Sequence, residues 1–211
     1  MLRLGKLVPA RTMLLLCDMQ ERFRNRVIYF PEIVQTSARL LQASRLLGVG
    51  AVVTEQYPDG LGPTVSELGA SDLPTFPKTS LSMVMPEVLA LLETLPAPRS
   101  VVLCGIEAQA CVMATALDLL ERGVDVHLIA DACSARSQVD RLMAFERMKQ
   151  SGVFITTSEC IILQLMCDAK HPKFREARHT QTHAMCTLRP REVSNARWQE
   201  VTGQTQVPRV D

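Results

Sequence analysis

The sequence predicts an α/β protein, a three-layer α-β-α domain built around a doubly wound sheet of six parallel strands. Three observations predict this fold class. Short apolar runs alternate with segments of helical periodicity, which is the pattern of a parallel sheet covered by helices on both faces. Several of these segments end at a glycine, at positions 48, 105, 123 and 152. A chain of 211 residues is also long enough for one domain with a sizeable core.

The first strand is expected at residues 13–17, an apolar run that stops at Asp18. A helix is expected to follow from Pro31, because proline is favoured at the first helical position. Gly48 can end this helix in a left-handed conformation. The second strand is then expected at residues 51–54, which completes the first strand–helix–strand unit.

A loop is expected over residues 57–77, which contain four prolines and three glycines. The third strand is expected within residues 76–84. Pro77 has no N–H group to donate to a neighbouring strand, so this strand should lie at an edge of the sheet.

The second half of the chain repeats the alternation of strands and helices. Strands are expected at residues 101–104, 124–130 and 153–156. The helices that follow them are expected to end at Arg122, Gly152 and Lys170. The residues Ser137-Gln138-Val139-Asp140 are typical of a capping box, which predicts the start of the middle helix.

These elements fill residues 13–172, so we expect a single domain over residues 1–175. Residues 176–211 are rich in Thr, Gln and Arg and show neither strand nor helix periodicity. We expect them to form a divergent, flexible tail that adds little to the core.

Composition argues against several classes of function. The net charge of +1 leaves no basic excess for general nucleic-acid binding. No apolar run approaches the length of a membrane span, so neither nucleic acid nor membrane is expected as a partner. The seven cysteines are an odd number and form no C-x-x-C pair, which favours free thiols in a reducing compartment.

The expected location is therefore the cytoplasm, with the mitochondrion and the nucleus as alternatives. The first sixteen residues carry Arg3, Lys6 and Arg11 without any acid, a composition that resembles a mitochondrial presequence. We expect a small-molecule substrate and a homo-oligomer, and leave further protein partners open.

The chemistry-bearing residues follow the ends of two strands. In open parallel sheets, ligands bind at the carboxyl ends of the strands, where the strand order reverses. If the first and fourth strands are the adjacent pair there, Asp18 faces the segment 105–111 across the crevice. An acid and a thiol in that position are a base and a nucleophile for attack on an electrophile.

Cys111 is expected near the start of a helix, where unpaired N–H groups and the helix dipole favour a thiolate and can stabilise an oxyanion. Each candidate residue has a structural alternative. Cys111 can be a small residue that packs the helix onto the sheet, and Asp18 can cap a turn. Lys78 can be an ordinary lysine on the surface.

Three segments resemble the signature segments of the isochorismatase-like cysteine hydrolases, at residues 15–20, 76–83 and 103–112. Residues 54–58, 60–64 and 130–137 resemble one animal branch of the same family. The resemblance covers residues 10 to about 176, and several motifs occur in the family's order and spacing.

The resemblance implies an Asp-Lys-Cys catalytic triad formed by Asp18, Lys78 and Cys111. By analogy, Asp18 moves the thiol proton, Lys78 supports the thiolate and orients the acid, and Cys111 forms a thioester. It also implies a cis peptide bond between Ile106 and Glu107. The amides of Glu107 and Cys111 would form the oxyanion hole.

Two departures from relatives in the family restrict the chemistry. Where the nicotinamidases carry metal-binding histidines, this chain has Glu55-Gln56-Tyr57, and its first histidine is His127, so no metal and no cofactor are expected. The isochorismate-cleaving enzymes do not need a cysteine nucleophile, so Cys111 favours acyl chemistry on an amide-like substrate.

The expected function is thus metal-free hydrolysis of a small C–N amide or related carbonyl compound. The alternative is a catalytically idle domain of the same fold that binds or regulates another protein. The expected substrate pocket is lined by Gln20, Phe23, Tyr57 and Ile106.

Overall fold

The computed structural model describes residues 4–177, which form one six-stranded, fully parallel sheet between two layers of helices. The strands are β1 (Thr12–Cys17), β2 (Gly50–Gln56), β3 (Thr75–Lys78), β4 (Ser100–Gly105), β5 (Asp125–Cys133) and β6 (Phe154–Thr156). The main helices are α1 (Phe30–Leu46), α2 (Pro58–Leu61), α3 (Pro86–Glu93), α4 (Met113–Glu121), α5 (Gln138–Gln150) and α6 (Ser158–Met166). The predicted fold class is confirmed.

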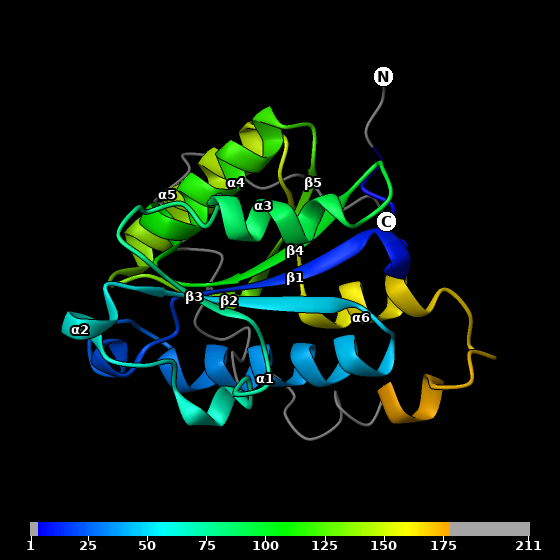
Figure 1. Ribbon diagram of the computed structural model, residues 1–211, viewed down its shortest axis with the longest axis horizontal. Coiled ribbons are helices and arrows are strands. Elements are labelled where there is room, and N and C mark those ends of the chain that lie inside the picture. Colours follow the sequence, from blue (N-terminus) through cyan, green and yellow to red (C-terminus); the bar gives the residue numbers. More distant parts are fainter. Residues whose placement is uncertain (1–3, 178–211) are drawn as a thin grey trace, which may run out of the picture.

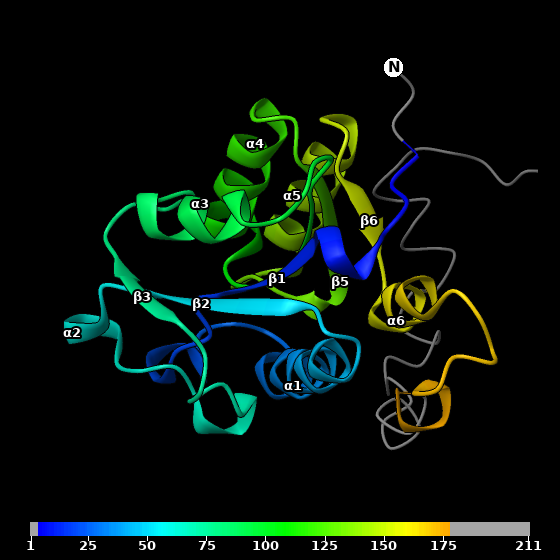
Figure 2. The ribbon, with the colours of Figure 1, turned by 45° about the vertical axis from the view of Figure 1, so that its right-hand side comes forward.

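The strand order is β3-β2-β1-β4-β5-β6, so the order reverses between β1 and β4. Helices α1 and α6 cover one face of the sheet, and α3, α4 and α5 cover the other (Figures 1 and 2). The carboxyl ends of β1 and β2 lie at the left of Figure 1, close to α2. The crevice expected at the reversal point therefore opens at that end.

Several element boundaries differ from those expected. β3 is an edge strand, as predicted, but it is only four residues long and ends at Lys78. β5 continues to Cys133, three residues beyond the expected end. The last helix ends at Met166 instead of Lys170, because Cys167 adopts a positive φ of 59°. Helix α3 was not anticipated from the sequence.

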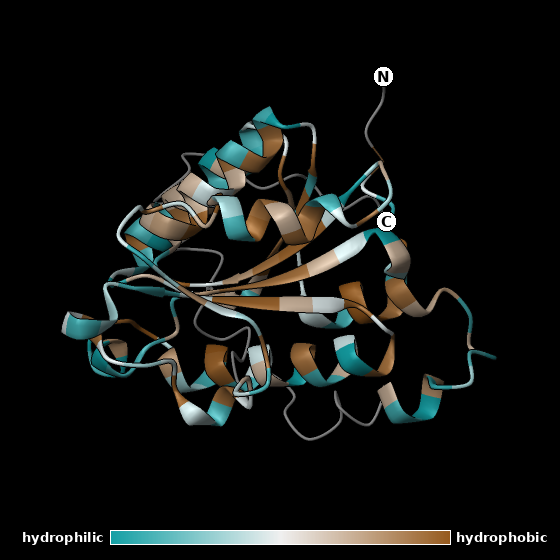
Figure 3. Cartoon of the chain, viewed as in Figure 1, coloured by the Kyte–Doolittle hydropathy of each residue, from teal (hydrophilic) through white to brown (hydrophobic). Residues whose placement is uncertain are grey.

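The two central strands supply the core. Every residue of β1 and of β4 is buried, which explains why both are continuous apolar runs instead of alternating ones. The hydropathy colouring shows the same contrast between apolar strands and mixed helices (Figure 3). Burying each leucine of β1 is worth about 2 kcal/mol relative to leaving it exposed.

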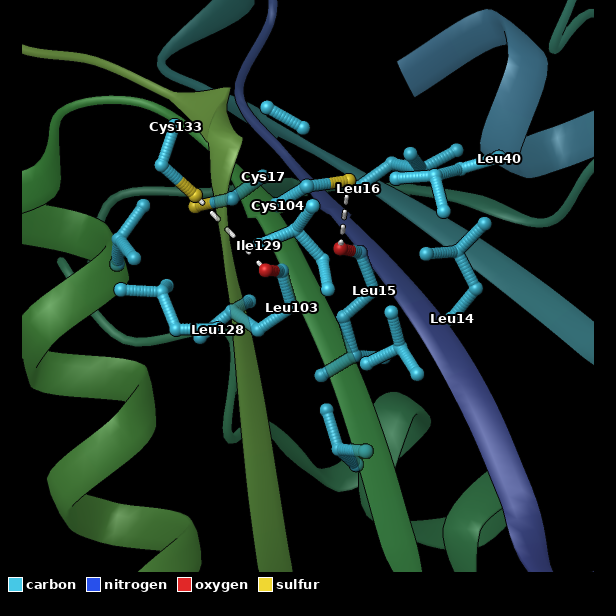
Figure 4. Close-up of a cluster of buried hydrophobic side chains, with 14 of the residues drawn as sticks. Leu14, Leu15, Leu16, Cys17, Leu40, Leu103, Cys104, Leu128, Ile129 and Cys133 are labelled. Atoms are coloured by element: carbon cyan, nitrogen blue, oxygen red, sulfur yellow. Dashed lines mark hydrogen bonds between the residues drawn. The ribbon is translucent and has the colours of Figure 1, made fainter. Parts of the chain in front are cut away.

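Two buried cysteines complete this core (Figure 4). The Cys104 thiol donates to the Leu15 carbonyl at 3.7 Å, and the Cys133 thiol donates to the Leu103 carbonyl at 3.8 Å. Burial raises the pKa of Cys104 to about 12 and also raises the pKa of Cys133. Both behave as packing residues with inert thiols.

The described chain remains packed up to its last residue, since Phe174 contacts the core and Ala177 is buried. The predicted tail from residue 178 onward lies outside the described residues. Within residues 4–177, no helix is long and apolar enough to span a membrane.

Candidate active site

A pocket of about 310 Å³ lies at the reversal point of the sheet. Both Asp18 and Cys111 line it, so the structure brings together the acid expected after the first strand and the thiol expected near the start of the helix that follows the fourth. The other lining residues are Phe23, Arg26, Gln56, Leu61, Leu81, Ile106, Glu107, Ala110 and Arg136.

Asp18 is held in place by the strand next to its own. It follows β1 with a positive φ of 51°, and its N–H donates to the Thr54 carbonyl at 3.1 Å. The Thr54 hydroxyl donates to Asp18 Oδ1 at 2.7 Å. The carboxylate is almost fully buried, with 1% of the residue exposed, so these contacts replace its hydration.

Lys78 at the end of β3 pairs with this carboxylate. Its ammonium lies 2.7 Å from Asp18 Oδ2 and 2.6 Å from Gln56 Oε1. It also donates to the carbonyls of Ser80 and Leu81 at 3.1 and 3.0 Å. The Lys78 side chain is only 2% exposed, so it is not the surface lysine of the structural alternative.

The surroundings of Lys78 keep it charged. Burial alone would lower its pKa, but the negative charge of Asp18 and the hydrogen bond to its carboxylate oppose that effect. The pKa of Lys78 is therefore raised above its usual value. Asp18 and Lys78 form a buried ion pair whose charges are both fully hydrogen-bonded.

Cys111 lies in a π-helical turn, Ala108–Val112, that leads directly into α4. Its carbonyl accepts a hydrogen bond from the Thr115 hydroxyl at 2.6 Å, and that hydroxyl accepts from the Met83 N–H at 2.9 Å. This relay ties the turn to the segment that follows Lys78. The Cys111 residue is 7% exposed, and its thiol points to Gln56 Oε1 at 3.8 Å.

Gln56 thus connects the ammonium with the thiol, since its Oε1 contacts both Lys78 and Cys111. The described residues show no direct hydrogen bond between the Asp18 carboxylate and the Cys111 thiol. Both groups nevertheless open into one pocket, and Lys78 contacts the acid directly and the thiol through Gln56.

Cys17 is a second thiol behind the nucleophile candidate. It is the last residue of β1 and is fully buried. Burial raises its pKa well above the usual range, and a hydrogen bond with Cys111 acts in the same direction. Cys17 therefore stays protonated and can donate to the Cys111 sulfur.

Gly105, at the end of β4, lets the chain approach Cys17 closely. It has φ 123°, and a Cβ at this position would lie 2.1 Å from the Cys17 carbonyl oxygen. That oxygen instead accepts the Ile106 N–H at 3.0 Å. The absence of a side chain at residue 105 is what brings the π-helical turn to the end of β1.

The Ile106–Glu107 peptide bond is cis, as the family resemblance implied. The Glu107 side chain faces the pocket and is 11% exposed. Its carboxylate accepts from Arg136 Nε at 3.1 Å and from Gln109 Nε2 at 2.8 Å. Glu107 is thus held by two partners instead of turning freely into solvent.

Two of the four expected pocket residues, Phe23 and Ile106, line the pocket. Gln20 and Tyr57 are not among its lining residues. Gln20 is fully buried, and its side-chain amide makes three hydrogen bonds of 2.7–3.0 Å to the backbone of Gln56 and Gly62. Tyr57 is 56% exposed beside α2, where its ring packs against Gly60.

The residues of the site that were not anticipated include Cys17, Thr54, Gln56 and, at the pocket wall, Arg26 and Arg136. Strand register explains one of them, since Gln56 is paired with Lys78, which was expected in the site. Cys17 and Thr54 are paired with each other, next to Asp18 at the end of β1. The register cannot be known before the strand order is.

No group of three or more His, Cys, Asp or Glu side chains is arranged to hold a metal ion among residues 4–177. Glu55, where the metal-binding relatives carry a ligand, instead accepts from the N–H and hydroxyl of Thr64 at 2.6 and 2.7 Å. Independence from metal stays a prediction that an elemental analysis can test.

Comparison with known proteins gives a consistent result. Residues 12–160 match the family model of the isochorismatase domain. The chain is 61% identical over 174 residues to isochorismatase domain-containing protein 2 of Xenopus laevis, a match that covers 82% of this chain and 85% of that protein. The human protein of the same name is 57% identical over 173 residues, covering 82% and 84% of the two chains.

Solved structures agree with this result. A structure named MAR1 ribonuclease, from Caenorhabditis elegans, superposes with a TM-score of 0.82 at 44% identity and covers 87% of this chain and 96% of that one. YcaC of Escherichia coli, described as an octameric hydrolase of unknown specificity, has a TM-score of 0.71 at 21% identity and supports the fold alone.

Proposed function

This chain belongs to the isochorismatase family, and from that premise we propose that it is a cysteine hydrolase that acts on small amides through Asp18, Lys78 and Cys111. The observation that carries the proposal is the buried Lys78 ammonium. It binds the Asp18 carboxylate directly and reaches the Cys111 thiol through Gln56 Oε1. Asp18 and Cys111 line one pocket, and Lys78, which is not among the lining residues, contacts Asp18 and Gln56 at its wall.

The proposed reaction has two halves. Asp18 accepts the Cys111 proton while the sulfur attacks the amide carbonyl carbon. The tetrahedral intermediate collapses, Asp18 gives the proton to the leaving nitrogen, and a thioester remains. Asp18 then takes a proton from water, whose oxygen attacks the thioester. Collapse of the second intermediate releases a carboxylic acid and returns the proton to Cys111.

Lys78 has a supporting role in this mechanism. Its charge stabilises the ionised carboxylate and sulfur, and its bonds to Asp18 and Gln56 orient both side chains. A buried ion pair is a poor device for stability alone, because desolvation costs about as much as the pairing returns. The complete set of partners around Lys78 therefore favours a catalytic use of the pair.

We assign the oxyanion hole to the backbone N–H groups of Glu107 and Cys111. Cys111 is the fourth residue of the helical segment that begins at Ala108, so its N–H belongs to the first turn. Such N–H groups can donate to an oxygen that becomes negative in the transition state. The fixed Glu107 side chain keeps the preceding peptide in place.

The ribonuclease name of one similar structure suggests another substrate, but the site offers little for RNA. The pocket is small, its acid and lysine are buried, and the chain has a net charge of +1. A chain that binds RNA would be expected to show a basic surface stripe. A catalytically idle binding domain is also less well supported, since it gives no reason for the buried pair.

The test is a panel of small aliphatic and aromatic amides, with RNA oligonucleotides as a further arm. The wild-type protein is expected to release ammonia or amine from at least one amide, and mass spectrometry of a quenched reaction should show an acyl group on Cys111. Cys111→Ala should lose the activity, whereas Cys160→Ala, at an exposed cysteine, should keep it. Equal turnover by Cys111→Ala, or cleavage of RNA alone, would overturn the proposal.

A further inference from the structure

We propose that Arg26 and Arg136 form an anion-binding end of the pocket, and that the substrate is a small amide bearing a carboxylate away from the scissile carbonyl. The amide part of this inference rests on the proposed function. The anion-binding part rests on the pocket alone, because both arginines line it together with Cys111.

The backbone brings the two arginines to the same wall. The Ile28 N–H donates to the Ala135 carbonyl at 3.0 Å, and the Ser134 hydroxyl donates to the Ile28 carbonyl at 2.6 Å. These two bonds fasten the segment after Arg26 to the segment before Arg136. Segments 110 positions apart in the chain are thus joined next to the two arginines, and both side chains line the same pocket.

The charges at this wall are not balanced. Within residues 4–177, no carboxylate pairs with Arg26, whereas nearby Arg24 makes paired bonds of 2.5–2.8 Å to Glu21 and Glu67. Arg136 contacts Glu107 through Nε alone, and its side chain is 64% exposed. The wall thus carries two guanidinium groups and one carboxylate, that of Glu107, which leaves a net positive charge there.

The remaining wall of the pocket determines what else the ligand can contain. Five apolar side chains line it: Phe23, Leu61, Leu81, Ile106 and Ala110. A pocket of about 310 Å³ is at the small end of ligand sites. At the catalytic end, Lys78 is already paired with Asp18, so it is not available for a second carboxylate.

These features together indicate that the substrate is a short hydrocarbon chain with an amide at one end and a carboxylate at the other. The planar guanidinium group donates two parallel hydrogen bonds to a carboxylate, which fixes its position as well as its charge. Such a contact would hold the far end of the substrate while its carbonyl meets Cys111.

The first test measures anion binding without any turnover. Butanoate, which has a single carboxylate and no amide to hydrolyse, is expected to slow the alkylation of Cys111 by iodoacetamide. In Arg26→Gln, the concentration needed for half-protection should rise about tenfold or more, the usual effect of losing a hydrogen bond to a charged group. The control is Arg22→Gln, which removes the same charge from an exposed residue outside the pocket.

The second test compares succinamate with butanamide, a neutral amide of the same chain length. The wild type should hydrolyse succinamate with the higher kcat/KM. Arg26→Gln should remove that preference, whereas the control Arg22→Gln should keep it. If butanoate protects Cys111 in the wild type but not in Arg26→Gln, and no amide is hydrolysed, the anion-binding end is supported and the proposed function fails. If the two amides have equal kcat/KM, and the wild type and Arg26→Gln are protected equally, the proposed anion-binding end is wrong. The proposed hydrolase function would still stand.

Discussion

The two ends of the sheet bury titratable groups in opposite ways. At the carboxyl end, Lys78 is buried with four oxygen acceptors around its ammonium, and its pKa is raised. Toward the amino end of β5, His127 is 2% exposed and stacks on Phe154 with ring centroids 5.0 Å apart. Its Nε2 has no hydrogen-bond partner within residues 4–177, and burial lowers its pKa to about 4.

The difference shows that burial alone does not determine the charge state. Both side chains are removed from water, which disfavours the charged form of each. The oxygens around Lys78 and the Asp18 carboxylate reverse that effect, whereas nothing offsets it at His127. A charged group is therefore kept only where the fold supplies partners, and that is the end of the sheet where the pocket lies.

The largest expected effect comes from removing the cation. Lys78→Met keeps most of the bulk of the side chain but leaves Asp18 buried without its ion partner. Breaking a buried pair on one side costs about 3–5 kcal/mol, so the free energy of unfolding should fall by about that amount. Urea denaturation at neutral pH measures it.

The double variant Lys78→Met with Asp18→Asn controls this experiment, because it removes both charges. It should recover much of the lost stability while remaining inactive. A double variant as unstable as the sum of the two single ones would show that the groups are not coupled, and the comparison between the two ends of the sheet would fail.

The next effect concerns the other end of the sheet. The pKa of His127 is about 4 in the folded protein and about 6.5 in the unfolded chain, so only the unfolded chain gains a proton between these values. Above about pH 6.5, His127 should not reduce the free energy of unfolding. As the pH drops to about 4, protonation of the unfolded chain at His127 should lower the free energy of unfolding by about 3 kcal/mol.

Replacing His127 with Phe should remove this share of the acid sensitivity, as judged by urea midpoints at neutral and acidic pH. The matched control is His171→Gln, a change at a histidine that lies outside the sheet and is only partly buried. Identical acid sensitivity in wild type and His127→Phe would contradict the prediction.

The smallest of these effects tests a single partner of Asp18. Thr54→Val keeps the shape of the side chain but deletes the hydroxyl that donates to Asp18 Oδ1. The loss of a hydrogen bond to a charged group should cost about 2 kcal/mol of unfolding free energy. Thr75→Val, at an exposed threonine of β3, should stay within about 0.5 kcal/mol of the wild type. Equal effects of the two substitutions would show that the Asp18 contact adds nothing.

The sequence was sufficient to predict the six strands, because β1 and β4 are apolar runs, the first followed by Asp18 and the second closed by Gly105. The reversal between them was a condition of the site hypothesis, which the strand order confirms. That topology singled out Asp18 and Cys111, and the resemblance to a family added Lys78 as the third catalytic candidate. Helix α3 was not predicted because its eight residues are too few to show a helical period clearly.

Residues that reach the site only because of strand register or of backbone contacts between distant segments could not be predicted from the sequence. Gln56 enters the site because it pairs with Lys78 across two strands, and Arg26 because Ile28 is bonded to Ala135. Gln20 shows the converse: its position suggested a pocket residue, but its amide joins the end of β2 at Gln56 to Gly62 after α2. Only the assembled fold specifies these contacts.

The central claim is that Cys111 is a nucleophile, and its reactivity toward iodoacetamide at about pH 6 tests it most directly, because an ordinary thiol is protonated there. Mass mapping of the partially labelled native protein should show Cys111 modified well before the other six cysteines, and Asp18→Asn should change its rate. Cys104 and Cys133 provide the internal baseline, since burial raises the pKa of both. Labelling of Cys111 no faster than that of Cys17 or Cys104 would contradict the account and favour a domain that only binds.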